Sequence, residues 1–185
     1  MHLKGERQNN FFNVCVGCIP SCCRGVRPPL TVRRRQIIEA YLKELGFHVE
    51  NLFTQTGYVF PREDAEGYCI FFDRKTKRCQ VHPVKPETCV AGPLTFDINV
   101  KNKKIEWHLK TEGSCLLAGA IGRDEKAFKK HLESAKREIF RLVSELDSES
   151  LKAILKIAEP ETFKIGEDNI GEDVLDKLLV ESKSV

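Results

Sequence analysis

The sequence predicts an α+β fold: a small irregular cysteine-cluster domain with short antiparallel strands, followed by an all-helical C-terminal extension. Two observations support this prediction. Apolar residues follow strand patterns between residues 57 and 111, and helical spacing dominates after Gly122. The length of 185 residues suits one domain with an appendage. We place the two parts at residues 11–121 and 122–185.

A first helix of about 14 residues is predicted after Pro28 and Pro29. Thr31 can cap its N-terminus, and Gly46 can end it. Its apolar residues recur at helical spacing: Ile37, Ile38, Tyr41, Leu42 and Leu45. The opposite face, which carries Arg33, Arg34, Arg35, Lys43 and Glu44, is expected to be solvated.

Short strands are predicted at residues 58–60, 69–72 and 79–82, with the last two joined by a turn over residues 73–78. The clearest strand pattern is a hairpin around the polar turn 101–104. Its apolar residues alternate on both arms: Leu94, Phe96, Ile98 and Val100, then Ile105, Trp107 and Leu109.

Helix formers dominate residues 122–185. A long helix is predicted from a stripe of apolar residues: Ala127, Phe128, Leu132, Ala135, Ile139, Phe140, Val143 and Leu146. Two shorter helices, residues 151–158 and 173–179, are separated by Pro160, Gly166 and Gly171. This part contains no cysteine, so we expect the chemistry to lie within residues 15–115.

Composition points to a soluble protein, with 41% apolar and 31% charged residues and no run of the ~20 apolar residues that span a membrane. The N-terminal residues lack the apolar core of a secretory signal, so we expect the cytoplasm. The net charge of +3 does not indicate nucleic-acid binding.

The eight cysteines are the most informative residues of the chain. In reducing cytosol, such a set is more often metal-binding than disulfide-bonded. Cys15 and Cys18 have the two-residue gap with which one turn presents two thiolates to a metal. The candidate ligands are Cys15, Cys18, Cys22, Cys23, Cys69, Cys79, Cys89 and Cys115. Intracellular disulfides, as in hyperthermophiles, and inert buried thiols, above all at Cys69 and Cys79, are the alternatives.

Eight thiolates would satisfy two four-coordinate centres, because zinc and iron-sulfur clusters each take four ligands. Neighbouring side chains of an extended segment point to opposite sides, so Cys22 and Cys23 are expected to serve different centres. The sequence does not assign the cysteines to centres, and one multinuclear cluster is the alternative. The thiolate-only set favours iron-sulfur over zinc, which frequently recruits histidine.

Several blocks together resemble the YkgJ-like CxxCxxCC cysteine-cluster family of zinc- or iron-chelating domains. They are Cys15-Val-Gly-Cys18-Ile-Pro-Ser-Cys22-Cys23, Cys69-Ile-Phe-Phe-Asp73, Cys79-Gln-Val-His82 and Lys85-Pro86-Glu87-Thr88-Cys89, with Cys115 downstream. The resemblance covers about residues 15–118 and implies that all eight cysteines are candidate metal ligands.

Two departures from the family pattern bear on the geometry of the site. Three residues rather than two precede Cys22, and Lys85 stands where arginine is common. A related cysteine pattern occurs in flagellin lysine-methylase-like proteins, which suggests a link with protein modification. The predicted function is therefore metal binding with a redox or protein-modifying role, and the alternative is a zinc-stabilised interaction module without catalytic activity.

Other residues give weaker indications. His82 could complete a mixed Cys/His zinc site, but a solvent-facing histidine is favoured. A basic run without acidic residues consists of Arg24, Arg27, Arg33, Arg34 and Arg35. We expect these arginines to offset the charge of a thiolate cluster, to bind an acidic protein partner or nucleic acid, or simply to be solvated. For Asp73, Glu87 and Asp97 we favour capping or turn roles over catalysis. No catalytic triad, phosphate loop or HExxH motif is present.

Overall fold

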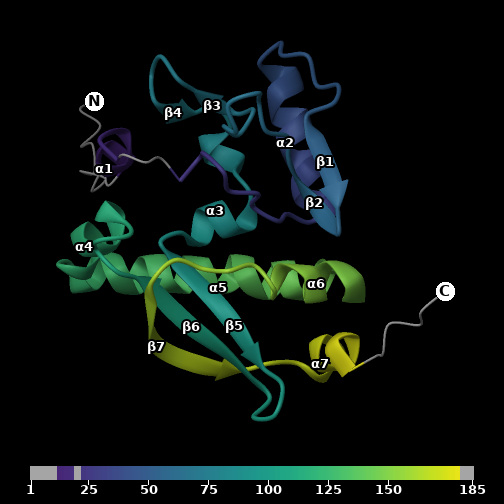
Figure 1. Ribbon diagram of the computed structural model, residues 1–185, viewed down its shortest axis with the longest axis vertical. Helices are drawn as coiled ribbons and strands as arrows, with labels where there is room; N and C mark the ends of the chain where they lie inside the picture. The colour runs from purple at the N-terminus through teal and green to yellow at the C-terminus, as the bar shows by residue number, and fades with distance from the viewer. Residues whose placement is uncertain (1–11, 19–21, 180–185) are drawn as a thin grey trace, which may run out of the picture.

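The computed structural model describes residues 12–18 and 22–179, and its fold is α+β, as predicted (Figure 1). The helices are α1 (Phe12–Val16), α2 (Val32–Glu44), α3 (Glu87–Ala91), α4 (Leu116–Gly122), α5 (Glu125–Glu145), α6 (Ser148–Ile154) and α7 (Glu172–Leu179), with a 3-10 turn η1 (His82–Val84). The strands are β1 (Phe53–Thr56), β2 (Tyr58–Pro61), β3 (Phe72–Asp73), β4 (Arg78–Cys79), β5 (Leu94–Asn99), β6 (Lys104–Lys110) and β7 (Thr162–Asn169).

The predicted hairpin is confirmed as β5 and β6, which pair antiparallel from Leu94 opposite Leu109 to Asn99 opposite Lys104. A third strand, β7, pairs antiparallel with the other edge of β6, so the C-terminal part is largely helical but not all-helical. The prediction missed β7 because its residues are mostly polar and Gly166 was interpreted as a separator. Gly166 lies instead where the register shifts, opposite Trp107, and glycine commonly marks such irregularities.

The larger hydrophobic core lies between this sheet and α5, which crosses the middle of Figure 1. Trp107 of β6 is buried there, and its ring meets Phe140 of α5 edge-on at 5.6 Å. The predicted apolar stripe is confirmed, since α5 buries Ala135, Ile139, Leu142 and Val143. The hairpin therefore shares its core with residues beyond 122, and the domain division at 121 stays a prediction.

A smaller core lies at the other end of the molecule, around α2. The predicted helix is confirmed, and Thr31 caps it by accepting a hydrogen bond from the Arg34 amide at 3.0 Å. The fully buried members of this core are Leu30, Ile38, Leu42, Phe71 and Val81. It is much smaller than the core under α5, and its strands are short. Packing alone therefore stabilises this end less.

The segments predicted as strands around Cys69 and Cys79 are largely irregular. Between β3 and β4, Phe72 pairs with Cys79 and Asp73 with Arg78, Cys69 forms an isolated bridge with Glu63, and η1 follows at His82. The turn between them is confirmed, because the Asp73 carboxylate accepts a hydrogen bond from the Lys75 amide at 2.9 Å. The backbone around these cysteines is thus bent rather than extended.

Gly57, between β1 and β2, offers a first test of the packing. Its φ of +77° disfavours a side chain, and an added Cβ would lie 3.3 Å from the Ala153 Cβ. We expect Gly57→Ala to lower the free energy of unfolding by ~1–2 kcal/mol. Gly122→Ala is the control, because a Cβ there meets no atom within 4 Å. Equal urea midpoints for the two variants would contradict the expectation.

Candidate metal centre

The eight predicted cysteine ligands come from five short segments of the fold. Cys15 lies in α1 and Cys18 just after it, Cys22 and Cys23 begin the next described segment, and Cys89 lies in α3. Cys69 and Cys79 belong to the irregular region of β3 and β4, and Cys115 immediately precedes α4. All eight lie among the described residues, and none of them forms a disulfide bond there.

The CxxC segment with Cys15 and Cys18 lies next to the segment of Cys115. The Cys18 amide donates a hydrogen bond to the Cys15 carbonyl at 3.2 Å, which closes the tight turn expected of a CxxC pair. Helix α1 packs on α4, and the two lie side by side in Figure 1. The Leu116 amide, which follows Cys115, hydrogen-bonds the Cys18 sulfur. The CxxC turn is therefore held against the start of α4.

Backbone hydrogen bonds join the Cys23 segment to the Cys69 segment. Arg24 and Tyr68 form an antiparallel bridge. The Cys69 amide donates to the Cys23 carbonyl at 2.8 Å, and the Gly25 amide donates to the Gly67 carbonyl, also at 2.8 Å. Cys23 therefore lies opposite Cys69 across this short ladder, and residues opposite each other in antiparallel pairs direct their side chains to the same face.

The Cys69 sulfur accepts a hydrogen bond from the Phe71 amide, and the Cys79 sulfur accepts one from the Val81 amide. In each case the donor lies two residues after the cysteine. Such N–H groups favour the thiolate over the thiol. In iron-sulfur centres, hydrogen bonds to the ligand sulfurs also shift the reduction potential of the cluster. Both loops thus already present donors to their sulfurs.

Burial raises the pKa of most of these thiols. It is the main cause at Cys15 and Cys69, where the pKa rises to about 11, and it also raises the pKa of Cys18, Cys79 and Cys89. At Cys22 the largest cause of the raised pKa is a hydrogen bond with the Cys23 side chain, followed by burial. These thiols therefore hold their protons at neutral pH unless a metal ion replaces them.

The positively charged side chain of Lys85 acts electrostatically on several of the thiols. Its ammonium opposes the rise in pKa at four cysteines from four segments: Cys15, Cys22, Cys79 and Cys89. Lys85 is half-buried between η1 and α3. Sequence reasoning noted it only as a departure from arginine, since its nearness to thiols up to 70 residues away arises from the fold.

Residues 14–115 match the family described as "CxxCxxCC: Putative zinc- or iron-chelating domain". The match covers more than half of the 185 residues. The chain belongs to this CxxCxxCC family. The family description supports metal binding by residues 14–115, and it agrees with either zinc or iron.

One curated relative is MJ0661 of Methanocaldococcus jannaschii, which is itself uncharacterized. It is 31% identical to the chain over 99 residues, and the aligned part covers 52% of each protein. The chain thus spans about half the length of this relative. No solved structure matches the chain.

The donor set agrees with the metals of the CxxCxxCC family, because thiolate is a ligand of both zinc and iron-sulfur clusters. Within residues 12–18 and 22–179, however, no group of three or more His, Cys, Asp or Glu side chains is arranged to hold a metal ion. The cysteines are brought to neighbouring positions without a closed coordination shell. His82 is exposed, which agrees with the favoured prediction that this histidine faces solvent.

The prediction of a solvated arginine run is wrong for Arg34. Its side chain is 10% exposed, and it pairs with Glu138 of α5 and, at 3.5 Å, with the fully buried Glu87 of α3. Thr31 also donates a hydrogen bond to Glu87 at 2.8 Å, so Glu87 holds α3 against α2 rather than serving only as a local cap, and Arg34 extends this network to α5. Sequence spacing gave no sign of this network, because its members lie far apart in the chain.

The other arginines of the run are exposed, and three have partners within the chain. Arg27 pairs with Glu63 at 2.8 Å and Arg35 with Glu39 at 2.9 Å. Arg24 donates to the Glu66 carbonyl at 3.2 Å. The Arg35–Glu39 pair offsets part of the positive charge that the first turn of α2 places against the helix dipole.

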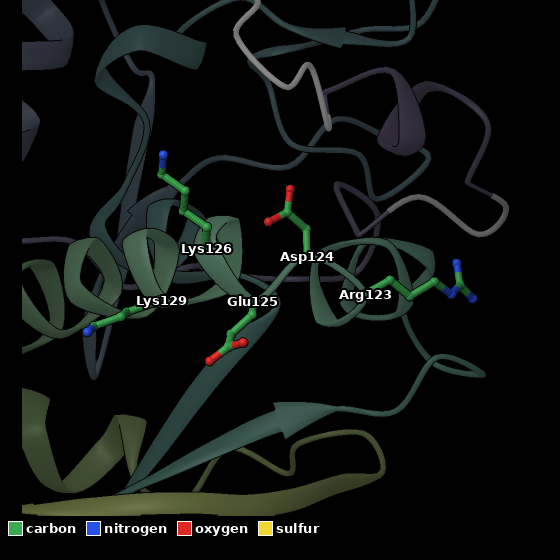
Figure 2. Close-up of a pocket in the computed structure, with 5 residues that line it drawn as sticks. All are labelled: Arg123, Asp124, Glu125, Lys126 and Lys129. Atoms are coloured by element: carbon green, nitrogen blue, oxygen red, sulfur yellow. The ribbon is translucent and has the colours of Figure 1, made fainter.

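A surface pocket at the junction of α4 and α5 is separate from the cysteines (Figure 2). It is lined by Arg123, Asp124, Glu125, Lys126 and Lys129. Figure 2 shows these side chains diverging rather than converging on one point. We assign it no role. In the described part of the chain, no helix has the length and apolarity to cross a membrane.

Proposed function

We propose that all eight cysteines ligate the metal, and that it is bound as iron-sulfur clusters rather than as mononuclear zinc. The observation that carries the proposal is that backbone contacts gather cysteines from separate segments, and that cysteines of four of these segments lie near the charge of Lys85. The ligand set consists of thiolates, which suits iron-sulfur clusters. Backbone N–H donors to the sulfurs of Cys69 and Cys79 support the same choice.

An iron-sulfur cluster would supply one-electron transfer, and the chain would then serve a redox or protein-modifying reaction. The second candidate is a zinc-stabilised interaction module without catalytic activity. The small core around α2 favours a structural role for the metal in either case. The exposed arginines, Arg24, Arg27, Arg33 and Arg35, are the surface we propose for an acidic protein partner.

Anaerobic purification followed by metal analysis and an absorption spectrum tests the proposal. We expect iron, acid-labile sulfide and broad visible absorption. Zinc without sulfide would reject the iron-sulfur proposal and favour the module. Absence of both metals, with four disulfides in the mass spectrum, would reject metal ligation by the cysteines altogether.

A matched pair of variants tests which side chains bind. Cys18→Ser should lose metal and become sensitive to protease near the cysteines, because it removes a thiolate from a turn that α4 holds in place. His82→Ala should keep the metal content of the unaltered protein, since His82 is exposed. Loss of metal in both variants would indicate a mixed Cys/His site.

A further inference from the structure

We propose that the eight cysteines form two neighbouring four-thiolate centres, with Cys15, Cys18, Cys22 and Cys115 in the first and Cys23, Cys69, Cys79 and Cys89 in the second. This division rests on the proposed function, because it requires the cysteines to be ligands. It names the ligands of each centre, which the sequence pattern does not.

The first centre is built where α1 meets α4. The turn from Cys15 to Cys18 is closed by a backbone hydrogen bond, and the Leu116 amide reaches the Cys18 sulfur. This contact brings the CxxC turn against Cys115, the residue before Leu116. The charges of Cys22 and Cys115 act on both Cys15 and Cys18, which agrees with this backbone contact.

The second centre is built on the ladder between the Cys23 and Cys69 segments. Cys23 lies opposite Cys69, whose amide donates to its carbonyl at 2.8 Å. The Phe72 amide donates to the Cys69 carbonyl at 2.8 Å, and Phe72 pairs with Cys79 across β3 and β4. The backbones of three of the four cysteines are therefore joined by this chain of pairings.

Cys89 completes the second centre from α3. The charges of Cys69 and Cys79 act on its thiol more strongly than that of Cys22. The buried Glu87, two residues earlier, holds α3 against Thr31 and Arg34 of α2. Cys89 is thus presented to the irregular loops of β3 and β4 from a fixed helix.

The two centres meet at the adjacent pair Cys22 and Cys23, whose side chains are hydrogen-bonded to each other. Cys22 also acts electrostatically on Cys79 and Cys89, so it lies on the side of the first centre that faces the second. The backbone assigns Cys23 to Cys69, which leaves Cys22 as the fourth thiolate of the first centre. Lys85 influences members of both groups.

Alkylation of the unaltered protein tests the division without any substitution. Chelated, reduced protein is titrated anaerobically with cobalt(II), and free thiols are labelled at each point and mapped by mass spectrometry. We expect two equivalents of cobalt per chain, with thiols becoming protected in the two stated sets of four. Protection of all eight together, or in sets that mix the two groups, would overturn the division.

The variants Cys22→Ser and Cys23→Ser sharpen the test, since they change adjacent residues. Each should bind one equivalent of cobalt, with the first set of thiols unprotected in Cys22→Ser and the second set in Cys23→Ser. The same unprotected set in both variants would overturn the division. If the unaltered protein binds no cobalt, the proposed ligation itself is rejected, whereas two equivalents with other sets reject only the division.

Discussion

Removal of the metal should increase amide exchange in residues 22–89 by at least about a hundredfold, equivalent to ~2.7 kcal/mol, while the sheet β5–β7 and α5 keep their protection. The reason is the unequal distribution of buried apolar surface. The core around α2 has five fully buried hydrophobic residues, and its strands contain two to four residues each. Bonds to a metal that exist only in the folded state contribute directly to its stability.

The hairpin β5–β6 is the internal control for this experiment. It precedes Cys115 in sequence, but its core lies under α5. Exchange measured by mass spectrometry, with and without chelator, should therefore separate residues 94–110 from residues 22–89. Equal protection of residues 22–89 in both samples would mean that the cysteines act as ordinary buried residues and that the metal has no structural role.

Local sequence signals predicted much of the fold. The alternation in the hairpin and the stripe of α5 determine which faces are buried, and Thr31 caps α2 through a bond to Arg34, three residues away. Strand β7 was not predicted because only Phe163 and Ile165 interrupt its polar sequence. It is a strand because β6 offers it an unpaired edge, which is a property of the tertiary structure.

In the candidate site, too, local sequence patterns predicted some features, whereas contacts between distant residues could not be predicted. The CxxC spacing predicts a tight turn, and the structure closes that turn with a hydrogen bond. The pairing of Cys23 with Cys69 depends on backbone bonds across 46 residues, so no local pattern encodes it. The prediction that the Cys22 and Cys23 side chains point to opposite sides of an extended segment is wrong, because both residues lie in a turn and their side chains are hydrogen-bonded to each other. Whether they serve different centres stays a prediction.

Arg34→Met should lower the free energy of unfolding by ~3–5 kcal/mol, because it leaves the fully buried Glu87 without its positive partner. Among the residues that the structure describes, the Oε2 atom of Glu87 already has no hydrogen-bond partner. Thr31 would remain as the side-chain donor to the other oxygen. Chemical denaturation of the metal-bound protein under anaerobic conditions measures the loss.

Arg35→Met is the matched control, because Arg35 is next in the helix and its ion pair with Glu39 is exposed. Its side chain is 48% accessible to solvent, compared with 10% for Arg34, and exposed i,i+4 pairs contribute only ~0.3–0.5 kcal/mol. The double variant Arg34→Met with Glu87→Leu should recover part of the loss, since it removes the unpaired buried charge. If Arg34→Met and Arg35→Met unfold at the same denaturant concentration, the Arg34–Glu87 contact does not hold α2 against α3. The position of Cys89 would then have to depend on the metal rather than on this network.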